Sequence, residues 1–185
     1  MNNNKSLLSL FLINGIFVFA SSLFGPLYAV YIEKLGTGIL SASLTWSVML
    51  VTTTLVTMVV AKYGDKVKEK EYLLIAGFII RSIAWFSYTI IQNVPQLIIV
   101  QVLVGIGEAV GSPAFDAIFA DHLDKKSEIM EYSGWKVLYN LVAALGTGIG
   151  GVLVVSFGFN IMFYVMSTLA ATSAVIAITR PRKLL

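Results

Sequence analysis

Residues 96–120 read QLIIVQVLVGIGEAVGSPAFDAIFA, and Glu108 and Asp116 are the ionisable side chains among them. A helix needs about 20 predominantly apolar residues to cross the hydrocarbon core of a bilayer, and this stretch is long enough. Its apolar residues form continuous runs, whereas the strands of a transmembrane barrel alternate apolar and polar residues. The stretch therefore predicts a membrane-spanning helix.

Five further apolar stretches accompany this one in the 185 residues. The chain is therefore predicted to be an all-α integral membrane protein, a single bundle (1–185) of six transmembrane helices joined by short loops. Lys5 and the apolar run after it resemble a secretory signal, but apolar sequence continues to Ile32 and predicts a retained helix. The expected spans are 7–32, 40–61, 72–91, 96–120, 132–156 and 161–179.

Basic residues gather in alternate loops. Ten of the 13 Lys and Arg residues fall on one side of the expected spans, and Lys34 falls on the other. Since Lys and Arg accumulate in cytoplasmic loops, both termini should face the cytoplasm in a multi-pass protein of the plasma (inner) membrane. The formal charge of +3 then reflects topology and predicts no nucleic-acid partner. The ten residues are Lys5, Lys62, Lys66, Lys68, Lys70, Lys125, Lys126, Arg180, Arg182 and Lys183.

The side chains that carry most enzyme chemistry are scarce. The chain has no cysteine, and its one histidine, His122, stands in a loop beside Asp121 and Asp124. A metal site needs several converging ligands, so a lone loop histidine predicts no metal. No nucleophile–base pair can be assembled from this inventory, so we expect neither an enzyme nor a cofactor.

Proline placement suggests an internal symmetry. Gly25-Pro26 falls about two-thirds of the way along the first span, and Pro113 occupies the same relative position in the fourth. Because these spans run in opposite directions, matching interruptions are what an inverted 3+3 repeat would produce. The alternative is that proline is simply common in membrane helices.

The fourth span carries a polar stripe. Gln101, Glu108, Ser112 and Asp116 are spaced so that they share one helical face. Such a face cannot contact lipid, so it should border the bundle interior or a water-filled cavity. Spans one, four and five are the expected cavity walls, and spans two, three and six are expected to face lipid more. The expected lining residues are Asn14, Ser21, Tyr28, Gln101, Glu108, Ser112, Asp116 and Asn140.

Arg81 and Glu108 both fall near the expected midplane of the membrane, Arg81 at a depth of roughly 14 Å. Two interpretations remain open. The pair is either a buried ion pair that fixes the packing of spans three and four, or a coupling site. In the second case Glu108 responds to a proton or cation, and Arg81 favours its charged form.

Several stretches are similar to the major facilitator superfamily. Residues 61–70, AKYGDKVKEK, resemble its loop signature between helices two and three. Residues 105–114, GIGEAVGSPA, and Asp121 resemble its fourth helix, and residues 146–151, GTGIGG, resemble the glycine motif of its antiporters. The resemblance covers the whole chain as the family's amino-terminal six-helix half. It implies one half of a major-facilitator fold and secondary active transport of a small solute by alternating access. It also implies a cytoplasmic gate at Asp65, Lys66 and Asp121.

A single bundle of this kind would expose its polar wall to lipid. We therefore expect, besides the lipid bilayer and a small-molecule solute, a homodimer or a second six-helix half, unless the chain is a fragment of a longer protein. A carboxylate in the cavity is compatible with proton-coupled efflux. The rival interpretation is a non-transporting membrane protein: a sensor, an assembly partner or an inactive half-transporter fragment.

Overall fold

The computed structural model describes residues 5–36, 38–124 and 126–180, and over these ranges it consists of helices joined by short loops, with no strand. Lys125, Arg182 and Lys183, which were used to predict the topology, lie outside the described residues. The α-helices are α1 (Lys5–Ser22), α2 (Tyr28–Lys34), α3 (Gly38–Tyr63), α4 (Glu71–Ser87), α5 (Val94–Asp121), α6 (Glu128–Phe157) and α7 (Phe159–Thr179). Short 3-10 helices occupy Gly25–Leu27, Gly64–Lys66 and Tyr88–Ile90.

Six helical segments are long and apolar enough to cross a membrane, and each overlaps one expected span. The chain is thus a multi-pass integral membrane protein; the cytoplasmic location of its ends stays a prediction. The six segments are Ser6–Lys34, Gly38–Lys66, Glu71–Ile90, Val94–Asp121, Glu128–Phe157 and Phe159–Thr179.

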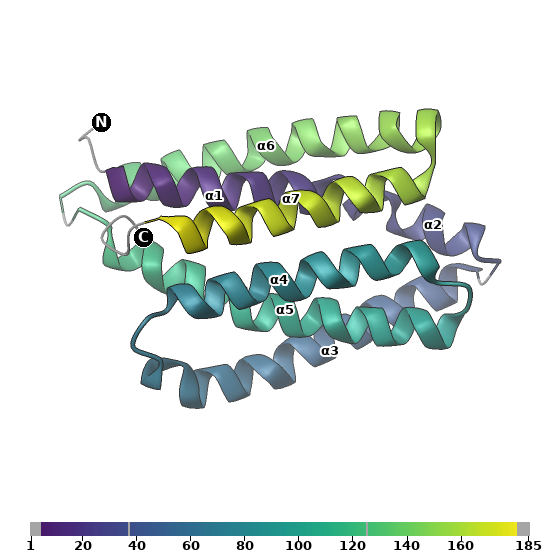
Figure 1. Ribbon diagram of the computed structural model, residues 1–185, viewed down its shortest axis with the longest axis horizontal. Helices are drawn as coiled ribbons and strands as arrows, with labels where there is room; N and C mark the ends of the chain where they lie inside the picture. Colours follow the sequence, from purple (N-terminus) through teal and green to yellow (C-terminus); the bar gives the residue numbers. More distant parts are fainter. Residues whose placement is uncertain (1–4, 37, 125, 181–185) are drawn as a thin grey trace.

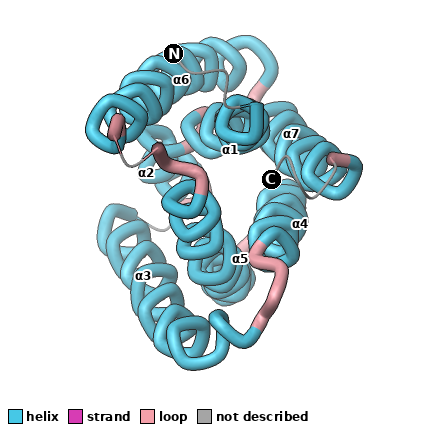
Figure 2. Tube along the Cα trace, turned by 90° about the vertical axis from the view of Figure 1, so that its left-hand side faces the viewer, coloured by secondary structure: helices cyan, strands magenta, loops and turns pink. Residues whose placement is uncertain are grey.

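The helices form two groups of three. Seen end-on, α1, α6 and α7 lie together, α3, α4 and α5 form the second group, and α4 packs against α7 to join them (Figure 2). Figure 1 places the start of α1, the end of α7, the connection 64–70, the end of α5 and the start of α6 at one end of the bundle. We call this the basic end, because Lys62, Lys66, Lys68 and Lys70 lie there.

Local sequence signals set the helix ends. The side chain of Asn93 accepts a hydrogen bond of 3.0 Å from the backbone N–H of Gln96 and so caps α5, whose first turn contains Pro95. Gly158 separates α6 from α7 with φ +82°, a conformation that other residues rarely adopt. These caps fix where each span starts, and therefore the depth of its polar residues.

The two prolines act differently. The first span is interrupted at Gly25–Leu27, between α1 and α2, as predicted. The predicted interruption of the fourth span is wrong, since α5 continues without a break through Pro113. Close packing of α5 on α4 explains this, because a Cβ added at Gly77 would lie 2.5 Å from the Cα of Gly111. Neighbouring helices stabilise proline-containing membrane helices. The inverted repeat itself stays a prediction.

Burial of the spans differs from the expectation. The third and sixth spans, α4 and α7, were expected to face lipid. In the most apolar 18 residues of each, however, 39% and 44% are buried, which is comparable with 44% for α5. The least covered spans are α3 and α6, at 6% and 11%. The reason is the α4–α7 contact, which places these two helices at the junction of the groups and leaves α3 and α6 as the outer helices.

Candidate functional site

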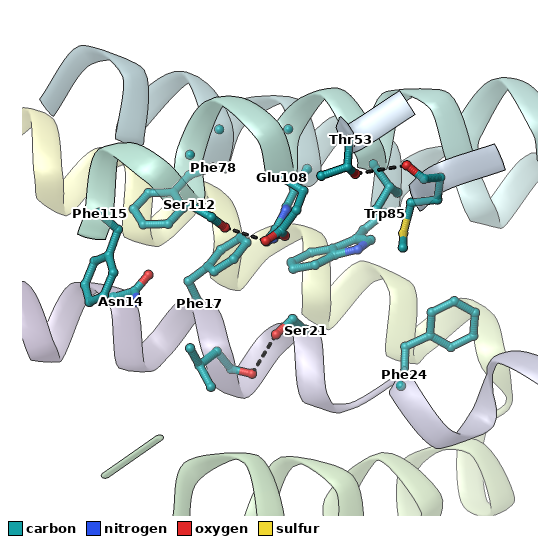
Figure 3. A pocket seen from close by; sticks show the side chains of 18 of the residues that line it. Asn14, Phe17, Ser21, Phe24, Thr53, Phe78, Trp85, Glu108, Ser112 and Phe115 are labelled. Carbon is teal, nitrogen blue, oxygen red and sulfur yellow. Dashed lines mark hydrogen bonds and ion pairs between the residues drawn. The ribbon is translucent and has the colours of Figure 1, made fainter. Parts of the chain in front are cut away.

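A cavity of about 700 Å³ separates α1 from α5, with further walls from α3, α4 and α6. Figure 3 shows Asn14, Phe17 and Ser21 projecting from α1 toward Glu108 and Ser112 of α5. The structure brings seven of the eight expected lining residues to this cavity: Asn14, Ser21, Tyr28, Gln101, Glu108, Ser112 and Asp116. Asn140 does not border it and lies exposed on α6. A role for these residues in solute binding stays a prediction.

Arg81 and Glu108 form an ion pair in the wall of the cavity. The Arg81 guanidinium contacts Oε2 of Glu108, and the Ser112 hydroxyl donates a hydrogen bond to Oε1. Both carboxylate oxygens therefore have partners. Arg81 is only 9% exposed, while the side chain of Glu108 is 38% exposed and faces the cavity. The pair is thus asymmetric, with a buried cation and a partly solvated anion.

Phe17 supports the buried guanidinium. Its ring centroid lies 4.5 Å from Cζ of Arg81, a cation–π arrangement, and the ring stacks on Trp85 at a centroid distance of 5.3 Å. On the opposite helix, Gly107 makes room for the arginine, because a Cβ there would lie 2.6 Å from Cγ of Arg81. The sequence analysis missed Phe17. The available signal was its position three residues after Asn14 and four before Ser21, on the same face of the helix.

Tyr28, Thr45 and Gln101 form a buried hydrogen-bonded triad at the end of the cavity away from the basic end. The Tyr28 hydroxyl is 2.5 Å from Oγ1 of Thr45 and accepts a hydrogen bond from the Gln101 amide. The three side chains are 5%, 2% and 1% exposed and join α2, α3 and α5. Gln101 therefore uses its amide to hold helices together, a role the polar stripe alone did not indicate. Nearby, the Tyr31 hydroxyl donates to the backbone oxygen of Tyr88 over 2.9 Å.

Tyr28→Phe is expected to destabilise the protein by about 1–3 kcal/mol, because it leaves the buried Gln101 amide without its acceptor. Thermal unfolding in a mild detergent measures the effect. Tyr164→Phe, at an exposed tyrosine of α7, is the matched control and should change stability by less than about 0.5 kcal/mol. Equal effects of the two substitutions would contradict the role of the triad.

The contacts at the basic end differ from those predicted for the cytoplasmic gate. Asp121, at the end of α5, forms an ion pair of 2.7 Å with Lys70, which precedes α4. Lys66 instead places its ammonium 5.1 Å from the centroid of the Tyr63 ring, and Asp65 is exposed. The structure thus joins Asp121 to Lys70, and it does not bring the predicted set of Asp65, Lys66 and Asp121 together in one contact.

Asp116 and Lys136 border the cavity toward the basic end. Each follows a buried aromatic residue, Phe115 and Trp135 respectively, whose ring centroids are 5.0 Å apart. The sequence analysis predicted Asp116 as a lining residue and did not include Lys136. Among the residues that the structure describes, no group of three or more His, Cys, Asp or Glu side chains could hold a metal ion.

An all-helical multi-pass bundle with charged groups facing an internal cavity is the architecture of a membrane transport protein. The family model described as Major Facilitator Superfamily matches residues 10–184. The chain therefore belongs to the major facilitator superfamily, as its sequence motifs implied.

Individual relatives are distant. The chain is 26% identical over 190 residues to the multi-drug resistance efflux pump PmrA of Streptococcus pneumoniae, a match that covers 97% of the chain and 45% of the pump. It is 25% identical over 156 residues to the uncharacterized MFS-type transporter MJ1560 of Methanocaldococcus jannaschii, covering 82% of the chain and 39% of that protein. The chain is 24% identical over 154 residues to the uncharacterized MFS-type transporter YitZ of Bacillus subtilis, a match that covers 82% of the chain and 92% of that protein. The chain thus spans less than half the length of PmrA and of MJ1560.

Proposed function

We propose that this chain forms half of a secondary transporter that moves a small solute across the plasma membrane by alternating access. The observation that carries the proposal is the cavity of about 700 Å³, which is lined by charged side chains inside an apolar bundle. Ionisable groups at membrane depth are costly, and a solute path accounts for them. The name of PmrA, an efflux pump, supports outward transport.

The Arg81–Glu108 pair is the proposed coupling site. Protonation of Glu108 would remove the charge that attracts Arg81, and the side chain of Glu108 is open enough to the cavity to exchange a proton. A proton arriving there would therefore change the contact between α4 and α5. Proton-coupled efflux uses such a carboxylate, whose charge differs between the two states of the transporter.

The proposed cytoplasmic gate comprises Asp65, Lys66 and Asp121, with Lys70 added as the partner that Asp121 contacts. Ion pairs between helix ends can hold one of two rigid-body arrangements and separate in the other. The Lys70–Asp121 contact joins the start of α4 to the end of α5 within the bundle. Its separation would loosen the basic end without disturbing the triad at the opposite end.

A second six-helix bundle completes the proposed transporter. The outer helices α3 and α6 both contribute to the cavity and are the least covered spans, so they are suited to contact a partner bundle. That partner is a second copy of the chain or another six-helix half. Because six spans return the chain to the side where it began, two copies inserted in the same orientation can pair about a two-fold axis along the membrane normal.

Transport in proteoliposomes tests the proposal. Ethidium, tryptophan and glucose are offered to liposomes with and without an imposed proton gradient, and we expect gradient-driven movement of at least one of them. Glu108→Gln should reduce that rate at least about tenfold, which corresponds to an increase of about 1.4 kcal/mol or more in the activation free energy of gradient-driven transport. Glu128→Gln, at an exposed position at the start of α6, is the control and should retain the rate.

Two results would contradict parts of this proposal. If no solute moves beyond the rate of empty liposomes, the non-transporting interpretation gains support. If native mass spectrometry in mild detergent resolves a monomer, and this monomer transports at full rate after reconstitution at one copy per liposome, the two-bundle assembly is wrong.

A further inference from the structure

Two opposite charges face the cavity near the basic end without neutralising each other. Asp116 of α5 and Lys136 of α6 both line the cavity, and both residues are exposed there. Lys136 is close enough to act electrostatically on Asp116. Over the described ranges, however, the ion pairs are Arg81–Glu108 and Lys70–Asp121, and neither Asp116 nor Lys136 belongs to one.

An aromatic contact joins α5 and α6 next to the two charges. Helix α6 packs on α1 and α7, whereas α5 packs on α3 and α4, so the two helices meet here mainly through side chains. Phe115 and Trp135 form this bridge, with ring centroids 5.0 Å apart and each residue 6% exposed. Phe11 of α1 packs against Trp135 from a third helix at 5.1 Å. Asp116 and Lys136 each directly follow a residue of this packed aromatic cluster, so the cluster fixes the backbone positions from which both charges extend.

The ammonium of Lys136 has a weak partner at present. It lies 5.6 Å from the ring centroid of Tyr139, one turn along the same helix, and such cation–π contacts are worth about 0.5–1 kcal/mol at exposed sites. A carboxylate would be a stronger partner in this partly desolvated cavity. Glu108 is not available for that purpose, because Arg81 and Ser112 engage both of its oxygens.

A solute with a single charge could satisfy only one of these two groups and would be repelled by the other. We propose that Asp116 and Lys136 bind the dipolar head of a zwitterionic solute, with its ammonium on Asp116, its carboxylate on Lys136 and its apolar body against Phe115 and Trp135. This assignment rests on the proposed function, in which the cavity is the solute path, and it names the substrate class.

Three indole compounds that differ only in head group test the assignment: tryptophan carries both charges, tryptamine the ammonium and indole-3-propionate the carboxylate. We expect the purified full chain in detergent to bind tryptophan at least about tenfold more tightly than either of the others in calorimetric titrations. Lys136→Gln should weaken tryptophan binding about tenfold and strengthen tryptamine binding, because the repelling charge is gone. Asp116→Asn should weaken the binding of tryptophan and of tryptamine, the two compounds that carry an ammonium.

The controls separate recognition from folding. Lys126→Gln removes an exposed lysine of the α5–α6 connection and should leave all three affinities unchanged. The exchanged pair, Asp116→Lys with Lys136→Asp, keeps one charge of each sign and should bind tryptophan more tightly than either single variant. Thermal unfolding of each variant identifies those that fail to fold, and the exchanged pair then decides the matter.

Several outcomes would overturn the assignment: equal affinities for tryptophan and tryptamine, no binding of any of the three compounds, or an exchanged pair no better than the single variants. Tryptophan binding without transport of any solute in proteoliposomes would instead support the head-group site and overturn the proposed function. Gradient-driven transport that is insensitive to both charges would retain the proposed function and overturn this assignment.

Discussion

Glu108→Gln is expected to lower the stability of the bundle by about 3 kcal/mol, because it leaves a buried guanidinium without its counter-charge. Arg81 is 9% exposed and lies between the ring of Phe17 and the backbone of Gly107, so its guanidinium has little contact with water. The expected loss is placed at the lower end of the range for broken buried pairs, since Glu108 itself is partly solvated.

A double-mutant cycle gives this prediction its test. Arg81→Met alone should destabilise less than Glu108→Gln, because the carboxylate left behind faces the cavity and keeps its hydrogen bond from Ser112. The double variant should be more stable than Glu108→Gln, since no buried charge remains. Unfolding by sodium dodecyl sulfate titration in mixed micelles measures each corner. Strictly additive effects of the two substitutions would show that the two charges do not interact.

Gly150→Ala is expected to destabilise the protein by about 2–3 kcal/mol through overpacking. Gly150 lies against α1, and a Cβ added there would collide with the backbone oxygen of Leu23. A backbone atom cannot move aside as a flexible side chain can, so α6 would have to shift away from α1. Its neighbour one turn earlier, Gly146, would also place a Cβ 2.9 Å from the backbone oxygen of Phe19. The close approach of α6 to the end of α1 and to Leu23 therefore depends on these two glycines.

Gly151→Ala is the matched control for this substitution. It makes the same chemical change one residue further along α6, where an added Cβ would meet no atom within 4 Å. Because alanine favours helix over glycine, the variant should be neutral or up to about 1 kcal/mol more stable. Both variants are compared in the same detergent titration. A loss of stability in Gly151→Ala equal to that in Gly150→Ala would mean that flexibility, and not close packing, sets the role of these glycines.

The six spans could be predicted because the requirement for about 20 apolar residues is a local property of the chain. The face of α5 that borders the cavity could be predicted equally well, because helical periodicity alone places Glu108, Ser112 and Asp116 on one face. The depth of Arg81 also pointed to its pairing with Glu108, because two charged side chains at the midplane of opposed helices lower their energy by contact.

Other features depend on how the helices are arranged, and periodicity does not contain that information. Tyr28, Thr45 and Gln101 meet only because α2 turns toward α3 and α5 beyond the interruption of the first span. The importance of Lys136 depends on Asp116, which lies on a different helix that α6 meets mainly through side chains. Asn140 was predicted to line the cavity because it is a polar residue of the fifth span, yet it is rotated by about 40° around α6 from Lys136 and does not border the cavity.

The interruption at Gly25–Leu27 has a mechanical consequence for the first span. The α-helical hydrogen bonds give way there to the tighter 3-10 bonds from Leu27 to Phe24 and from Tyr28 to Gly25, so α1 and α2 are two helical segments joined by a short 3-10 turn. Helix α1 is held by ring packing at Phe17, and α2 is held by hydrogen bonds of the Tyr28 and Tyr31 hydroxyls. Ring contacts of Tyr28 with Trp46 and of Tyr31 with Phe163 also hold α2, so a bend at this turn would have to separate these rings as well as break the hydrogen bonds, while the Arg81–Glu108 pair on α4 and α5 keeps its geometry.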